Sequence, residues 1–223
     1  PAAALAWSGG GHTYIALHTH KKAGLTTPSD LCNRVYGALS VDLFNYDFSA
    51  TGQALAAIVH GEGNATAAEA WEVATGVAAP TRAELAFAYG FSSHNDGWGT
   101  DYVAHWSSRT LDPSQGYVVW KAAQLAAVLP SEALVLIPAP LVPLVTHVLV
   151  EYSMDLLLAD ADPAIGPSLV EAASLAAAPG YACAEQAGSR VLVDTLFPHV
   201  AGIVGDGAAE ATILGSDLVN RQV

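Results

Sequence analysis

The feature that most constrains the fold is a series of Ala-, Leu- and Glu-rich segments separated by short Gly or Pro breaks. Apolar residues recur in them at helical spacing, whereas the alternating pattern of a β-strand is scarce. Thr81 and Glu84 have the spacing of a capping box, and Ser131 precedes a Glu in a comparable first turn. The sequence therefore predicts one compact all-α domain of roughly seven to nine helices. The expected helical segments are 28–40, 50–60, 65–77, 81–93, 117–129, 141–159, 167–177 and much of 189–223.

Composition narrows the functional classes. The chain has 223 residues, of which 52% are hydrophobic and 13% are charged, and its formal net charge is −13. It is too apolar for a disordered chain and long enough for one well-buried core. Its acidity argues against binding a nucleic-acid backbone through Lys and Arg. Hydrolysis of a phosphodiester held by metal ions remains open, because the metal cations then replace the basic side chains.

The N-terminal residues 1–6 resemble the end of a secretory signal peptide, because the last three follow the small-x-small pattern that signal peptidase cuts. Cleavage there would leave Trp7 as the mature N-terminus, one domain at 7–223, and a secreted or periplasmic protein. An ordinary Ala-rich start is the alternative. In an oxidising compartment Cys32 and Cys183 could pair, and they could equally be two buried thiols.

The most apolar stretch, residues 133–150, contains three prolines and His147, and it runs directly into Glu151. Those features strongly disfavour a helix that faces lipid. We therefore expect an interior helix entered through a Pro-broken segment, and no transmembrane segment.

Eight histidines and 21 acidic residues stand out in a chain with little other charge. His147 and Glu151 are four residues apart, so on a helix they share one face, one turn apart. In so apolar a helix, two ionisable side chains must either satisfy each other or coordinate something. Metal coordination is the common solution, and a simple His–Glu hydrogen bond is the alternative.

The densest cluster places His94, Asp96, Asp101 and His105 within twelve residues. Asp101 and His105 have the four-residue spacing of one helical face, and His94 lies about two turns before Asp101. Two glycines between them argue against an unbroken helix, so a local loop could instead bring these groups together. A solvated polar turn with a core histidine is the alternative.

Three further groups complete the inventory. His12 follows three glycines, so the backbone there can closely approach whatever the imidazole binds. Asp42 lies inside an apolar segment, and His60 ends an Ala-rich helix. Each alone is more often structural than catalytic. Taken together, imidazoles with a few carboxylates are typical zinc ligands, whereas an all-oxygen set would have indicated Ca²⁺ or Mg²⁺.

In their order these motifs resemble the zinc-dependent phospholipase C family, which is related to single-strand nucleases of the S1/P1 type and to the N-terminal domain of glycosylphosphatidylinositol-specific phospholipase D. They span about two thirds of the chain, and the tail after residue 159 contributes none. The elements that carry the resemblance are Ala6-Trp7-x-x-Gly10-x-His12, Tyr36-Gly-Ala-x-x-x-Asp42, His60, Phe91-x-Ser-His94 through Asp101-x-x-x-His105, and His147-x-x-x-Glu151.

One spacing departs from the family. The first His and the Asp of the central motif are usually four residues apart there, whereas His94 and Asp101 are seven apart here. If the intervening residues form a bulge rather than a helix, Asp96 competes with Asp101 as the ligand. The spacing to His105 favours Asp101.

The resemblance implies a trinuclear zinc centre in an all-α fold of the phospholipase C and P1 nuclease type. Asp101 would be shared between two of the three ions. The implied ligands are Asp42, His60, His94 and Asp101 for one ion, His105, His147 and Glu151 for a second, and His12, Asp101 and the amino and carbonyl groups of Trp7 for the third.

The resulting functional expectation is an exported zinc metallohydrolase that cleaves phosphodiesters, with phospholipids as the favoured substrate and transient contact with a membrane surface. Asp42 could also orient or deprotonate the attacking water. Trp98, Tyr102 and Trp106 could shape a lipid-accepting mouth, although ordinary core packing is favoured for at least two of the three. The alternatives are a single-strand nuclease and a non-catalytic helical binding protein that zinc stabilises.

Overall fold

The computed structural model describes residues 8–60, 65–107, 114–174 and 187–221, which contain eleven α-helices and no strand. The all-α expectation is confirmed. Three short helical segments, η1 (Ser40–Phe44), η2 (Tyr102–Trp106) and η3 (Ala139–Leu141), join the longer ones. The helices are α1 (Gly9–Ala23), α2 (Pro28–Leu39), α3 (Ala50–His60), α4 (Ala65–Thr75), α5 (Arg82–His94), α6 (Tyr117–Val128), α7 (Ser131–Leu136), α8 (Val142–Ala161), α9 (Ile165–Ala173), α10 (Ala187–Val204) and α11 (Asp206–Asn220).

More helices form than the seven to nine that the sequence predicts. The capping box of Thr81 and Glu84 does start α5, and Ser131 starts α7. Helix α1 was not expected, because its first turn is three glycines, which have poor helix propensity. The C-terminal region is divided into α10 and α11 at Gly205, whose φ of 86° is readily adopted only by glycine.

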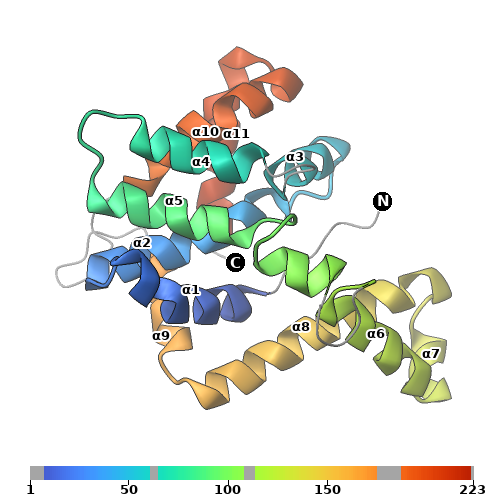
Figure 1. The fold of residues 1–223 in the computed structure, drawn as a ribbon. Helices are drawn as coiled ribbons and strands as arrows, with labels where there is room; N and C mark the ends of the chain where they lie inside the picture. The colour runs from blue at the N-terminus through green and yellow to red at the C-terminus, as the bar shows by residue number, and fades with distance from the viewer. Residues whose placement is uncertain (1–7, 61–64, 108–113, 175–186, 222–223) are drawn as a thin grey trace.

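The main core lies where α2, α5, α10 and η1 meet. Helix α5 lies between α4 and α2, and α1 covers the other side of α2 (Figure 1). Large apolar side chains fill the centre, among them Val35, Phe44, Phe87, Phe91 and Leu192. A second, smaller core joins η2, α6 and α8 through Ala104, Val118, Ala122 and Val150.

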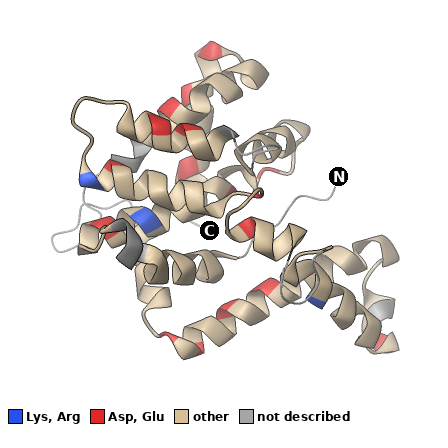
Figure 2. Ribbon diagram, in the orientation of Figure 1, with Lys and Arg blue, Asp and Glu red and all other residues tan. Residues whose placement is uncertain are grey.

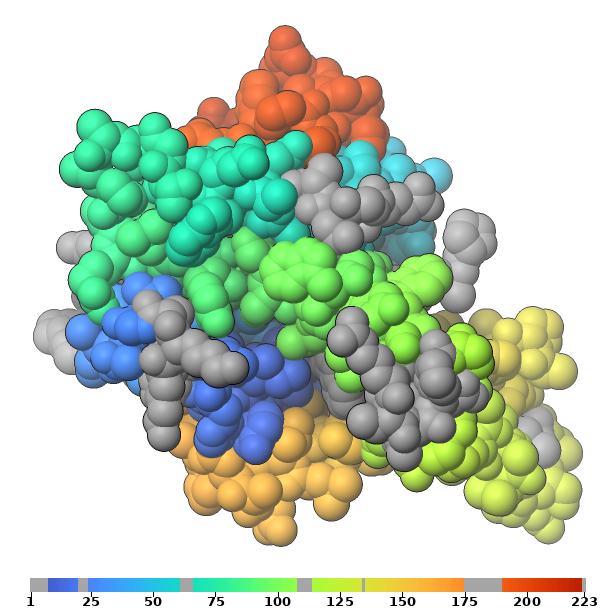
Figure 3. Space-filling view, in the orientation of Figure 1, coloured from blue at the N-terminus to red at the C-terminus, as the bar shows by residue number. Residues whose placement is uncertain are grey.

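Helices α6, α7 and α8, residues 117–161, form an arm that projects from the main body in Figures 1 and 3. The expectation that α8 is an interior helix is wrong. Only 11% of its most apolar window is buried, and Leu149, Leu156 and Leu157 are exposed. The helix passes over one face of the body, so apolar residues on its other sides remain uncovered.

By length and composition, Ala139–Ala161 is the one described segment that could cross a membrane. Helices of soluble proteins can have the same length and composition, so these two properties alone do not assign a membrane span. The absence of a transmembrane segment stays a prediction.

Helices α2 and α5 touch backbone to backbone. A Cβ atom on Gly37 would lie 2.1 Å from the carbonyl oxygen of Phe87, and one on Gly90 would lie 2.0 Å from that of Arg34. Real side-chain atoms do not approach so closely, so only glycine fits at both positions. This close crossing brings the carbonyl oxygen of Ala38 on α2 within 2.6 Å of His94 Nδ1 at the end of α5.

We predict that Gly37→Ala and Gly90→Ala each lower the free energy of unfolding by about 1–3 kcal/mol, because the added methyl group forces the helices apart. Urea denaturation followed by circular dichroism measures the change. Gly215→Ala on α11 is the matched control, since its Cβ would meet open space. That control should be neutral or stabilising by about 0.5–1 kcal/mol. Equal stability of Gly90→Ala and Gly215→Ala would contradict the tight crossing.

Candidate metal centre

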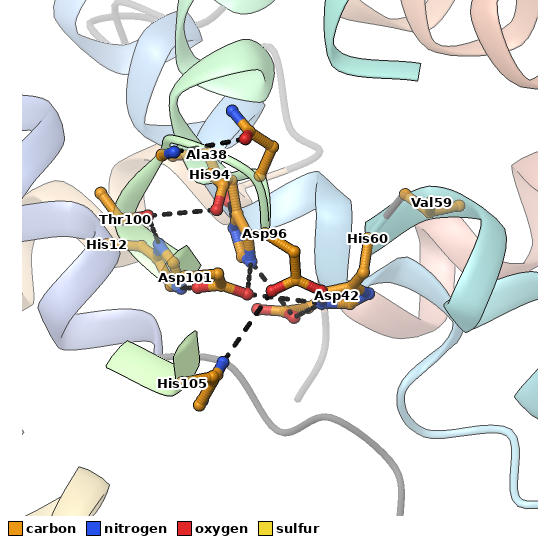
Figure 4. Close-up of polar contacts among 12 residues, drawn as sticks. His12, Ala38, Asp42, Val59, His60, His94, Asp96, Thr100, Asp101 and His105 are labelled. Atoms are coloured by element: carbon orange, nitrogen blue, oxygen red, sulfur yellow. Dashed lines mark hydrogen bonds and ion pairs between the residues drawn. The ribbon is translucent and has the colours of Figure 1, made fainter. Parts of the chain in front are cut away.

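The structure brings together all eight described side chains that the sequence analysis selects as metal ligands, in neighbouring groups that could hold metal ions. They come from helix ends, short helical segments and the interior of α8, which converge between the body and the arm, and Figure 4 shows several of them pointing toward one another. They are His12 on α1, Asp42 on η1, His60 at the end of α3, His94 at the end of α5, Asp101 just before η2, His105 on η2, and His147 and Glu151 on α8.

Two histidines and two aspartates form the innermost group. His60 Nε2 lies 3.2 Å from Asp42 Oδ1 and 3.8 Å from Asp101 Oδ2. His94 Nε2 lies 3.0 Å from Asp101 Oδ2 and 3.8 Å from Asp42 Oδ1. Each imidazole nitrogen therefore lies within 3.8 Å of both carboxylates, and Asp42, His60 and His94 form one group that could hold a cation.

Backbone carbonyl groups orient both of these imidazoles. His60 Nδ1 donates to the carbonyl oxygen of Ala56 at 3.0 Å, and His94 Nδ1 donates to that of Ala38 at 2.6 Å. The neutral ring then carries its lone pair on Nε2, the atom that faces the carboxylates. Metal-binding histidines typically have this arrangement, because the Nδ1 bond sets both tautomer and ring orientation.

Asp101 connects this group to His12. Its second oxygen, Oδ1, lies 3.4 Å from His12 Nε2, and the His12 and His94 rings stack with centroids 3.7 Å apart. Both Asp101 oxygens, His12 Nε2 and His94 Nε2 are buried without a hydrogen-bond partner. Such groups are costly to bury, and a cation on each side of the Asp101 carboxylate would compensate them.

The third group lies where the arm meets the body. His147 Nε2 lies 2.9 Å from Glu151 Oε1, and His105 Nε2 lies 3.7 Å from the same oxygen. The His105 and His147 rings stack with centroids 5.1 Å apart. The four-residue spacing in α8 thus places the His147 and Glu151 side chains on the same face of the helix, one turn apart, where they contact each other.

A turn rather than a helix links His94 to Asp101. Helix α5 ends at His94, and the Asn95 side chain accepts hydrogen bonds from the N–H groups of Gly97 and Trp98, each at 2.9 Å. The Asn95 amide is the signal that the sequence analysis missed, since Asn commonly caps such turns. Asp101 joins the innermost group, whereas Asp96 Oδ1 faces His105 Nδ1 at 4.0 Å.

Burial and mutual charge shift the ionisation of these groups. Burial and the neighbouring His94 lower the pKa of His12 to about 3. Burial would also lower the pKa of His94, but the Asp101 and Asp42 carboxylates outweigh it and raise that pKa to about 9. Burial acts against charge at Asp101 too, yet His94 and His12 hold its pKa below the usual value.

His105 behaves like His94. Burial would lower its pKa, but the neighbouring Asp96 and Glu151 carboxylates outweigh that effect and raise the pKa to about 10. Without a metal, protons on His94 and His105 therefore take the place of cations beside the carboxylates.

A cavity of about 600 Å³ opens beside these groups, and its wall includes both Asp42 and Glu151. Most of the remaining wall is apolar or aromatic. It includes Leu39, Tyr46, Phe48, Val148, Tyr152, Leu169 and Val170.

The three residues predicted to bind substrate do not line that cavity. Trp98 and Trp106 are 60% and 58% exposed, so the alternative that two of the three pack in the core is wrong. Tyr102 is half-buried. Their contact with substrate stays a prediction.

The two cysteines and the N-terminal residues complete the set of predicted residues. Cys32 is disulfide-bonded, and Cys183 lies outside the described residues. Residues 1–6 and Trp7 also lie outside them, so the mature N-terminus and its ligand role stay predictions.

Comparisons with protein-family models, curated proteins and solved structures found no match to this chain.

Because His94 and His105 are protonated at neutral pH without metal, we predict that binding of Zn²⁺ at pH 7 releases about two protons per chain. The apparent affinity should rise from pH 6 to pH 9, because zinc has to displace both protons and their displacement becomes easier as the pH rises toward the two pKa values. Titration calorimetry in buffers of different ionisation enthalpy measures the release. His18→Gln, an exposed histidine paired with Asp162, should leave the release unchanged. Metal binding without proton release would contradict the raised pKa values.

Proposed function

We propose that this protein is a zinc metallohydrolase that cleaves phosphodiester bonds, with phospholipids as the favoured substrates. The observation that carries the proposal is the buried Asp101 carboxylate, whose two oxygens face imidazole nitrogens of different histidines. Burying such a charge without hydrogen bonds is strongly unfavourable, and bridging two cations is a common way to stabilise it.

The donor atoms fit zinc. A tetrahedral zinc ion with bonds of 2.0–2.2 Å separates its ligand atoms by about 3.3–3.6 Å. The nitrogen-to-oxygen distances in the innermost group, from 3.0 to 3.8 Å, bracket that value. Neutral imidazoles mixed with carboxylates also suit zinc better than Mg²⁺ or Ca²⁺, which prefer oxygen ligands.

Three ions are proposed, and the sharing of Asp101 between two of them is supported by its diverging oxygens. The third ion would also use the amino terminus at Trp7, which follows from the resemblance to the phospholipase C family. The proposed ligands are Asp42, His60, His94 and Asp101 for the first ion, His105, His147 and Glu151 for the second, and His12, Asp101 and Trp7 for the third.

Zinc at these positions would polarise a phosphoryl oxygen and lower the pKa of water, so attack on phosphorus would need no Ser or Cys nucleophile. Asp42 is suited to orient that water or accept its proton. It lines the cavity, and Asn45 Nδ2 donates to Asp42 Oδ1 at 2.6 Å. Burial would raise its pKa, but His94 and His60 lower it, so the carboxylate stays ionised.

The cavity supports a lipid-like substrate, because an apolar wall next to the acidic groups can receive the organic part of a phosphodiester. Acidic positions outnumber basic ones along the ribbon in Figure 2. The six positive charges of three zinc ions would bring the formal charge of −13 to −7 and leave a locally positive site for phosphate. Export and transient contact with a membrane surface belong to the same proposal.

A single-strand nuclease is the second candidate, because Tyr46, Phe48 and Tyr152 give the cavity aromatic side chains on which a base could stack. A purely structural zinc protein is less well supported. Structural sites are closed by protein ligands, whereas Asp42 and Glu151 both lie on a cavity wall.

We predict that the purified protein binds zinc and hydrolyses phosphatidylcholine, and that Asp101→Asn lowers kcat/KM by about 10³-fold or more, since a metal ion contributes several kcal/mol to such reactions. Metal analysis and phosphate-release assays measure both effects. Asp206→Asn, an exposed acid on α11, is the control and should behave like the unchanged protein.

Single-stranded DNA is assayed in parallel. Cleavage of DNA alone would establish the nuclease alternative. Tight zinc binding with neither substrate cleaved would establish the structural alternative, and less than one tightly bound zinc per chain would overturn the metalloenzyme proposal.

A further inference from the structure

Helix α1 begins without the usual local cap. Its first turn is Gly9, Gly10 and Gly11, and the Ser8 side chain at the N-cap makes no capping hydrogen bond. Instead Ser8 Oγ donates to the carbonyl oxygen of Glu151, 3.4 Å away on α8. The N–H groups at a helix start have no partner inside the helix, so they need acceptors from elsewhere.

Asp155 supplies those acceptors from α8. Its Oδ2 accepts from the Gly10 N–H at 3.2 Å, and its Oδ1 accepts from the Gly11 N–H at 2.9 Å. The Gly11 N–H also reaches the Ser8 carbonyl oxygen at 3.0 Å, so Gly10 is the amide that depends most on Asp155. A negative carboxylate is further stabilised by the positive end of the helix dipole.

Gly10 makes this contact possible. A Cβ atom there would lie 2.6 Å from the Asp155 carboxylate, closer than any side chain allows. Glycine is a poor helix former, but at this position its missing side chain allows α8 to approach α1 closely.

The contact joins two groups of the candidate metal centre. His12 directly follows Gly11 in α1, and Glu151 lies one turn before Asp155 in α8. Figure 1 shows α1 and α8 coming from the body and the arm, respectively. Among the described residues no side chain of α8 belongs to the main core, and the Asp155 carboxylate ties α8 directly to the backbone of α1.

We propose that Asp155 is a positioning residue. By fixing α8 against the first turn of α1, it holds the His12–Asp101 group and the His105–His147–Glu151 group at the separation that metal binding requires. This role rests on the proposed function, because it concerns the same metal ions. Asp155 itself is not a ligand in the proposal. It acts through the two helices that carry His12 and Glu151.

The test compares Asp155→Asn with the unchanged protein. Loss of the orienting carboxylate should weaken zinc binding at the His12–Asp101 group and at the His105–His147–Glu151 group by about 10–100-fold. That is the usual cost of removing a group that orients metal ligands. The ion at Asp42, His60, His94 and Asp101 should keep its affinity. Stepwise competition with a chelator measures the affinities, and the absorption spectrum of the cobalt-substituted protein reports the geometry at each position.

A metal-free measurement tests the contact directly. Hydrogen exchange at the Gly10 amide should accelerate at least tenfold in Asp155→Asn without zinc. Asp160→Asn is the matched control, because Asp160 is an exposed acid on the same helix. Gly10→Ala is a second route to the same loss, since its methyl group displaces the carboxylate while the charge stays. If Asp155→Asn fails to fold, Gly10→Ala decides the question.

The outcomes separate the two proposals. Unchanged zinc affinities in Asp155→Asn, or unchanged exchange at Gly10, would overturn the positioning role. A lower melting temperature with all affinities retained would also overturn it, as a purely structural contact. If the unchanged protein binds no zinc, the proposed function fails and the metal-positioning role with it, while the exchange measurement still decides whether Asp155 holds α1.

Discussion

The burial of the Asp101 carboxylate among imidazoles is the constraint on which the rest of the structure depends. A charge with no hydrogen-bond partner is stable inside a protein only if other charges compensate it. Without metal, a proton on His94 does so, because the Asp101 and Asp42 carboxylates outweigh burial and raise the pKa of His94 to about 9. With metal, the cations would take over. The same atoms can therefore exist as a protonated cluster or as a metal centre, and the two states exclude each other.

Helix packing supplies the precision that such a cluster needs. The glycine crossing of α2 and α5 brings the Ala38 carbonyl group to His94, and the last turn of α3 brings the Ala56 carbonyl group to His60. Both rings are held by backbone atoms, which cannot change rotamer. On the other side, α8 presents Glu151 from an arm whose apolar face is largely exposed. There the Asp155 carboxylate of α8 accepts hydrogen bonds from the first turn of α1.

Much of the fold follows from local pattern. The Thr81 and Glu84 capping box and the long apolar-periodic segments predict most helices within a few residues, because these signals act over one or two turns. The exceptions have non-local causes. Helix α1 has a glycine start whose Gly10 N–H is bound by Asp155, 145 residues away. Helix α8 has the composition of an interior helix, but whether it is covered depends on how many other helices pack around it.

For the site, the sequence alone determined which residue types occur at ligand spacing within each segment, such as His147 with Glu151, since a helix fixes what lies one turn apart. It could not determine how the segments meet. Only the tertiary structure decided that Asp101 lies between His12 and His94 and that Asp96 faces His105, because the Asn95 turn redirects the chain between them. Tertiary packing also decided that the cavity reaches Asp42 and Glu151 rather than Trp98 and Trp106. Distances between helices arise from side-chain packing over the whole chain, and no local spacing encodes them.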